Sequence, residues 1–180
     1  MRNVKIAVFL LSALLSVSAF ADSPGKGGNF VGKPSPEFEA ADLNGAKIAS
    51  RMILKSGKAI VLNFWGLRCS ACIMEMPHIN ALKNKYADRV QVLGINVDGI
   101  GGGILSAQIA KMKIDIGYTV VPDPDFKMVD MFKMGAAPLT IIIDAGGVVR
   151  YRHEGYEDGD EIRIEEALIG ALEGGKASLK

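Results

Sequence analysis

Short apolar runs and amphipathic stretches alternate along most of the chain. The apolar runs with the length of strands span residues 59–64, 90–97, 118–121 and 139–143. The run at 59–64 is nearly unbroken, which is typical of a strand covered on both faces of a sheet. The last run is followed by a turn at 144–147 and a further strand pattern at 148–154, which together predict a hairpin.

Stretches with a helical spacing of apolar residues separate these runs. They cover residues 50–55, 70–86, 104–112, 126–134 and 161–172. Pro77 lies inside the second stretch and is expected to kink it, because proline cannot donate a helical hydrogen bond. Asp160 precedes the last stretch and can cap it.

Turn chemistry near the N-terminal side adds one more element. Asn44-Gly45 separates residues 38–43 from 46–48 and suits a tight β-hairpin turn. The complete order is therefore β-β-α-β-α-β-α-β-α-β-β-α, without a repeat or a second domain. This order predicts an α/β fold with a mixed central sheet and helices on both faces.

The chain ends differ in composition from this domain. Residues 1–21 carry Arg2 and Lys5, then an apolar run, then Ala19-Phe20-Ala21, which is the layout of a cleaved signal peptide. The apolar run is short for a membrane span, which needs about 20 residues, although an uncleaved membrane anchor is the alternative. The expected parts that follow are a flexible lead-in at 22–33, the domain at 34–173 and a polar tail at 174–180.

Charge does not point to any class of partner. The chain has 180 residues with 21 basic and 20 acidic side chains, and removing a signal peptide would take away Arg2 and Lys5. There is no basic block of the kind that binds nucleic acid, so that class of function is excluded.

The chemistry concentrates at residues 66–77, which are GLRCSACIMEMP and hold both cysteines of the chain, Cys69 and Cys72. Exported proteins often use disulfides as staples. A bridge across so short a loop contributes only about 2 kcal/mol before strain, against about 3 kcal/mol for a 15-residue loop. The pair is therefore better explained as a disulfide that opens and closes.

The cysteines lie where a buried strand passes into a helix. Unpaired N–H groups and the positive end of the helix dipole stabilise a thiolate at such a place. Cys69 is at the mouth of the turn and should be exposed, whereas Cys72 is one turn into the helix and should be shielded. We therefore expect Cys69 to attack and Cys72 to resolve the mixed disulfide.

Glu75 is the candidate proton carrier for Cys72. It falls on one helical stripe with Cys72, Ile79, Leu82 and Tyr86, so it should point toward the covered side. Burial raises the pKa of a carboxyl group and lets it take and return a proton near neutral pH. The alternative is that Glu75 bends out to solvent beside Pro77.

These motifs resemble the active-site segment of thioredoxin-like proteins, and more narrowly the exported TlpA/ResA group. The matching segments are VGKPSPEF at 31–38, FWGLRCSAC at 64–72, EMP at 75–77 and GAAPLTIIID at 135–144. The resemblance implies a thioredoxin fold with an N-terminal β-hairpin extension, and it places the buried family glutamate at Glu75. It also implies a cis Pro138 facing the cysteines, with the Ala137 backbone turned toward an incoming chain. Trp65, Arg68, Ala137 and Pro138 are the expected substrate-docking residues.

The sequence departs from the family at some positions. Arg68 stands where the family usually has Trp, and it can favour the Cys69 thiolate, steer an acidic partner or be simply solvated. Ser70-Ala71 between the cysteines leaves the direction of electron flow open, because this pair helps to set the redox potential. Asn63 occupies the position of the buried aspartate of ordinary thioredoxins, which moves proton handling onto Glu75.

The resemblance implies a periplasmic thiol–disulfide oxidoreductase that acts as a reductant. Its partners would be cysteine-containing exported proteins, apocytochrome c among them, and a membrane thiol reductant would donate its electrons. A monomer without a bound cofactor or metal is expected. The alternatives are a copper carrier using Met74, Met76 and His78, a thiol peroxidase, and a binding module with a fixed disulfide. Gly66 stands where such peroxidases carry Thr.

Overall fold

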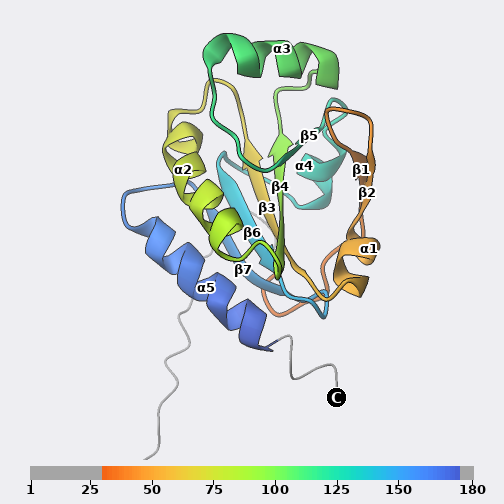
Figure 1. The fold of residues 1–180 in the computed structure, drawn as a ribbon, viewed down its shortest axis with the longest axis vertical. Coiled ribbons are helices and arrows are strands. Elements are labelled where there is room, and N and C mark those ends of the chain that lie inside the picture. The colour runs from red at the N-terminus through yellow and green to blue at the C-terminus, as the bar shows by residue number, and fades with distance from the viewer. Residues whose placement is uncertain (1–29, 175–180) are drawn as a thin grey trace, which may run out of the picture.

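The computed structural model describes residues 30–174 of the chain. The expected signal peptide, most of the lead-in and nearly all of the polar tail lie outside the described residues. Within 30–174, no helix is both long and apolar enough to cross a membrane. The elements follow the order predicted from the sequence (Figure 1), namely β1 (Glu39–Ala41), β2 (Lys47–Ala49), α1 (Ser50–Lys55), β3 (Ala59–Trp65), α2 (Ser70–Lys85), β4 (Val90–Asn96), α3 (Gly102–Met112), β5 (Thr119–Pro122), α4 (Lys127–Met131), β6 (Leu139–Ile143), β7 (Val149–Glu154) and α5 (Asp160–Gly174).

The central sheet has the strand order β5-β4-β3-β6-β7, with β3 in the middle. β3 and β5 both run parallel to β4, whereas β6 runs antiparallel to β3 and to β7. β1 and β2 form a separate antiparallel hairpin. The mixed sheet and the N-terminal hairpin are therefore as predicted.

Helices cover both faces of the sheet, and α2 lies beside α5 on one of them (Figure 1). β3 alternates between the two faces, as strand side chains must. Ile60, Leu62 and Phe64 pack with Phe38 and Phe132 on the side of α1 and α4. On the other side, Ala59 and Val61 belong to the cluster that α2 and α5 cover. Because both faces are buried, the strand is apolar along nearly its whole length.

Several boundaries differ from those expected. α4 is shorter than residues 126–134, because Phe126 and Lys133 have positive φ values of 56° and 50° and leave the helical region. α3 begins at Gly102, since a pattern of apolar residues does not register the glycines of its first turn. α5 begins at Asp160 and ends at Gly174, so Asp160 is a helical residue. α2 is continuous through Pro77.

Gly94 in β4 leaves room for an aromatic ring. A Cβ atom at this position would lie 2.6 Å from Cε2 and 3.2 Å from Cδ2 of Tyr118. Tyr118 is buried, with 7% of its surface exposed, so its ring cannot move aside into solvent.

We therefore expect Gly94→Ala to lower the free energy of unfolding by about 1–3 kcal/mol, the usual cost of overpacking a core. Chemical denaturation monitored by circular dichroism measures this. Gly170→Ala in α5 is the matched control, because a Cβ there meets no atom within 4 Å. An unchanged stability for Gly94→Ala would show that the ring is not confined.

Candidate active site

The cysteine pair lies at the junction of β3 and α2 and forms a disulfide, with an S–S distance of 2.03 Å. Cys69 is the N-cap of α2 and has extended backbone angles, and its Sγ accepts a hydrogen bond from the Cys72 amide at 3.1 Å. Cys69 is half-buried, whereas Cys72 is only 1% exposed. The pair thus has the unequal access that the sequence predicted, and the roles of attacking and resolving sulfur stay predictions.

Asp98, just after β4, fixes the turn that carries Cys69. Its Oδ2 accepts from the Leu67 amide at 2.9 Å and from Asn96 Nδ2 at 2.6 Å. A carboxylate that receives a backbone N–H holds the loop in one conformation. Sequence reasoning missed this residue, because only the parallel pairing of β3 and β4 brings the ends of the two strands together.

Cys72 is surrounded by apolar side chains. It packs in one cluster with Trp65, Met76, Leu105 and Val120. A thiolate formed there loses much of its hydration, so it needs a group nearby that accepts the proton. Trp65 is fully buried in this cluster. The expectation that Trp65 contacts a docked substrate stays a prediction.

Glu75 lies on the covered face of α2, with 1% of its surface exposed. Its Oε1 accepts from Thr140 Oγ1 and its Oε2 from Asn63 Nδ2, both at 2.7 Å. Burial raises the pKa of Glu75 from 4.5 to about 7, against the opposing effect of the hydrogen bonds from Thr140 and Asn63, and the charge of Asp160 raises it further. The alternative of a solvent-facing Glu75 is wrong, and the predicted sheltered carboxyl group is present.

The hydrogen-bond partners of Glu75, Asn63 and Thr140, are paired with each other on neighbouring strands of the sheet. Asn63 pairs with Gly94 on one side and Thr140 on the other. The hydroxyl of Tyr118 donates to Asn63 Oδ1 at 2.9 Å, which extends the buried polar network to the residue before β5. The sequence signal for Thr140 was a lone polar residue in an apolar strand, and sequence reasoning missed both Thr140 and Tyr118.

The loop before β6 lies against the cysteines. The Ala137–Pro138 peptide bond is cis, as the resemblance implied. Ala137 packs against the cluster that contains Cys72, as Cys69 does. Gly155 donates its amide to the Pro138 carbonyl at 2.7 Å, and Gly135 donates to Glu154 Oε1 at 2.8 Å. β7 therefore holds this loop in place, while a docking role for Ala137 and Pro138 stays a prediction.

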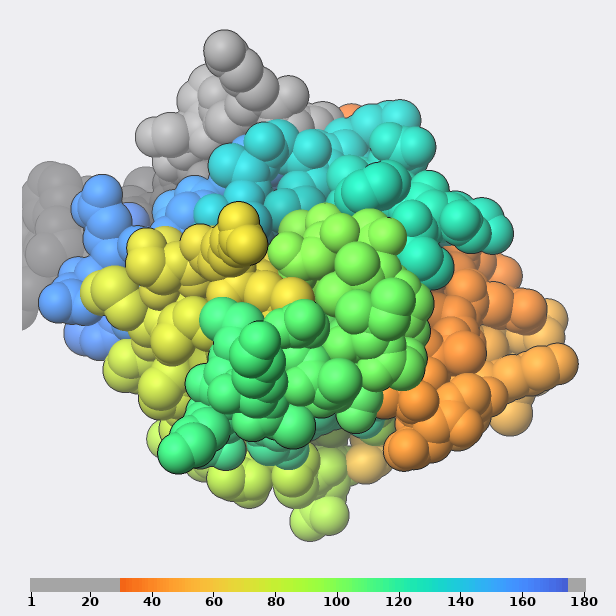
Figure 2. Space-filling model, turned by 90° about the horizontal axis from the view of Figure 1, so that it is seen from above, coloured from red at the N-terminus to blue at the C-terminus, as the bar shows by residue number. Residues whose placement is uncertain are grey.

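The start of α2 lies on the face shown in Figure 2, where its yellow atoms border green atoms of the α3 region and cyan atoms of the segment after α4. Arg68 on this part of the chain is exposed, and all three interpretations of it stay open.

The residues considered for copper do not share one environment. Met74 is 50% exposed, Met76 is 2% exposed, and the ring of His78 stacks on Tyr156 with 5.8 Å between centroids. In the part of the chain described, residues 30–174, no group of three or more His, Cys, Asp or Glu side chains could hold a metal ion.

Comparisons with known proteins agree with this geometry. Residues 31–152 match the AhpC/TSA family. The chain is 31% identical over 120 residues to the thiol-disulfide oxidoreductase ResA of Bacillus cereus, covering 66% of each chain. It is 30% identical over 147 residues to ResA of Geobacillus thermodenitrificans, covering 81% of this chain and 82% of the relative. The chain thus spans about two thirds or more of these relatives. A crystal structure of a putative thiol:disulfide interchange protein DsbE from Chlorobium tepidum superposes with a TM-score of 0.69 and 26% identity, covering 77% of this chain and 95% of that one.

The raised pKa of Glu75 makes stability depend on pH. Between pH 4.5 and about 7, the folded protein keeps the Glu75 proton while the unfolded chain releases it, so stability falls as the pH rises through this window. The whole effect amounts to about 3 kcal/mol. We expect Glu75→Gln to lack this loss. The free energy of unfolding of the variant, taken relative to that of the wild type, should therefore increase from pH 4.5 to pH 8.

Urea unfolding of the oxidised proteins at a series of pH values measures the difference. Glu166→Gln is the control, because Glu166 is exposed on α5 and its variant should follow the wild type at every pH. A constant difference between the wild type and Glu75→Gln would contradict the raised pKa.

Proposed function

The chain belongs to the AhpC/TSA family and to the ResA group of thiol–disulfide oxidoreductases, and we propose that it exchanges electrons with protein cysteines through Cys69 and Cys72. The observation that carries this proposal is the disulfide at the start of α2 with the buried Glu75 one turn further along the same helix. A structural staple would need no carboxyl group with a pKa near neutrality. A redox pair needs one, since its inner sulfur must lose and regain a proton.

The proposed reaction begins with the reduced pair. The Cys69 thiolate attacks a substrate disulfide, forms a mixed disulfide and releases one substrate thiolate, which takes up a proton. The Glu75 carboxylate then accepts the Cys72 proton, and the Cys72 thiolate attacks the Cys69 sulfur. The second substrate thiolate leaves and is protonated, so the substrate gains two electrons and two protons while the Cys69–Cys72 disulfide forms. A dithiol donor reverses these steps.

The loop at Ala137 and Pro138 is the proposed docking site for an extended substrate segment, with Arg68 beside it. Ala137 packs against the same cluster as Cys69, which supports this placement. The N-terminal sequence supports export by a cleaved signal peptide, and hence a periplasmic location. We propose exported cysteine-containing proteins as substrates, apocytochrome c among them, and a membrane thiol reductant as donor.

The resolving step provides the direct test. Cys72→Ala should accumulate a mixed disulfide through Cys69 with insulin whose disulfides are intact, because no second sulfur remains to release the substrate. Mass spectrometry and non-reducing gels detect the adduct, which dithiothreitol should remove. Cys69→Ala is the matched control and should form much less adduct, since Cys72 is only 1% exposed. Equal trapping by both variants would contradict the assigned order.

The redox potential of the pair decides its direction. A value of about −250 mV or lower would indicate a reductant, and one of about −120 mV an oxidant.

Titration of the reduced protein with Cu(I) tests the copper carrier, and tight stoichiometric uptake would favour it. Rapid consumption of hydrogen peroxide would favour the peroxidase, and failure of dithiothreitol to open the disulfide would favour a binding module.

The proton relay predicts a pH–rate profile. Glu75→Gln should slow the reduction of glutathione disulfide at pH 7 by at least about tenfold, because a positioned general base contributes about 100-fold or more. The inflection near pH 7 in the wild-type profile should also disappear. Stopped-flow measurements between pH 5 and 9 record both effects, with Glu166→Gln as control. A wild-type profile for Glu75→Gln would remove Glu75 from the mechanism.

A further inference from the structure

Tyr118 reaches the active-site network from an unexpected distance. It immediately precedes the edge strand β5, and two strands away its hydroxyl donates to Asn63 Oδ1 on β3. The ring approaches Gly94 of β4 so closely that a Cβ atom there would lie 2.6 Å from it. Gly94 is the direct neighbour of Asn63 in the sheet. The bare backbone of β4 is what lets the ring pass over the intervening strand.

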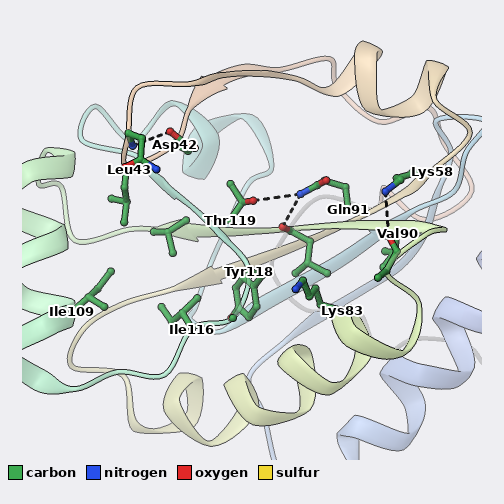
Figure 3. A pocket seen from close by; sticks show the side chains of 15 residues that line it. Asp42, Leu43, Lys58, Lys83, Val90, Gln91, Ile109, Ile116, Tyr118 and Thr119 are labelled. Atoms are coloured by element: carbon green, nitrogen blue, oxygen red, sulfur yellow. Dashed lines mark hydrogen bonds between the residues drawn. The ribbon is translucent and has the colours of Figure 1, made fainter.

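The ring of Tyr118 is buried but borders a surface groove, and its hydroxyl lies in the interior. Figure 3 shows the Tyr118 side chain among the residues that line a groove beside β4 and β5, next to Ile116. The hydroxyl is buried and is hydrogen-bonded to Asn63.

The hydrogen bond to Tyr118 bears on the orientation of the Asn63 amide. A side-chain amide has a donating end and an accepting end of nearly the same shape, so a half-turn exchanges them. Here Oδ1 accepts from Tyr118, and Nδ2 donates to Glu75 Oε2 at 2.7 Å and to Thr140 Oγ1 at 3.2 Å. We propose that the Tyr118 hydroxyl is a positioning group that holds the Asn63 amide with its nitrogen toward Glu75.

The orientation matters because the two ends of the amide favour different forms of Glu75. The Nδ2 donor stabilises the carboxylate, whereas an Oδ1 turned toward Glu75 would repel it and accept a hydrogen bond from the protonated acid. Without the hydroxyl, Oδ1 loses its donor in a buried place, and turning the amide becomes the way to satisfy it. Tyr118 therefore favours the form of Glu75 that accepts the Cys72 proton, and this inference rests on the proposed function.

Other polar and charged groups lie around Glu75 besides the Asn63 amide. Asp160 on α5 raises the pKa of Glu75 by its charge, and it lies 3.2 Å from His153 Nε2 of β7. Burial and the hydrogen bond to Glu161 raise the pKa of Tyr156, and the charge of Glu75 adds a smaller effect in the same direction. His78 of α2 stacks on the Tyr156 ring. Thr140 donates from β6, and Cys72 precedes Glu75 on α2. A test on Tyr118 must therefore leave these groups unchanged.

Tyr118→Phe removes only the hydroxyl. In the oxidised protein, where the cysteines do not titrate, the titration midpoint of the Glu75 carboxyl group should rise from about 7 by about one pH unit. Carbon-13 NMR of protein labelled in glutamate measures this, and Glu75→Gln assigns the resonance. The pH–rate profile for glutathione disulfide should move to higher pH by the same amount.

Two comparisons separate positioning from general damage. Tyr86→Phe is the matched control, because it removes a hydroxyl bonded to Glu165 at 2.8 Å near the other end of α2, and it should leave the Glu75 midpoint unchanged. In an Asn63→Ala background, Tyr118→Phe should shift nothing further, since the hydroxyl acts through the amide. If Tyr118→Phe fails to fold, NMR of the Asn63 side-chain amide in the wild-type protein still tests the proposal. The proposal expects a single amide orientation, and exchange between two orientations would overturn it.

The outcomes also separate this inference from the proposed function. An unshifted Glu75 midpoint in folded Tyr118→Phe, with wild-type disulfide exchange intact, overturns the role of Tyr118 alone. A wild-type protein that does not exchange disulfides would instead overturn the function, whatever the titration shows.

Discussion

The candidate active site depends on keeping the carboxyl group of Glu75, which follows Cys72 on α2, out of water. Glu75 is nearly inaccessible, and among residues 30–174 Asn63 and Thr140 are the donors that replace the water that it has lost. Too few donors would keep the group protonated at all relevant pH values, and more donors would keep it ionised. Two donors in an apolar layer give a pKa of about 7, at which the group can exchange a proton in both directions.

The fold supplies this balance through its layers. β3 is central, so its polar residue is flanked by strands on both sides and covered by α2. The same strand ends where the cysteine turn begins and carries Asn63, the partner of Glu75, so one strand supports both the two sulfurs and the buried carboxyl group. The Ala137–Pro138 loop packs against the cluster that contains Cys72, because it leads into β6, the other neighbour of β3.

Sequence reasoning found the parts of the site that lie close together in the chain. The order of elements, the placement of Cys69 and Cys72 and the burial of Glu75 follow from local periodicity. Thr140, Tyr118 and Asp98 were missed, because each acts through strand pairing between distant segments, which local patterns do not encode. The resemblance named Trp65 for substrate docking, and the alternation of β3 turns its side chain into the cluster that contains Cys72.

The partners of Glu75 have a consequence for how the chain matures. Asn63 precedes Glu75 by 12 positions, but Thr140 follows it by 65, and Tyr118 lies 55 positions beyond Asn63. The network is therefore incomplete until β6 has docked, which is late in synthesis and among the slower kinds of contact to form. A nascent chain carries its two thiols without the buried acid, so the complete site arrives only with the finished tertiary structure.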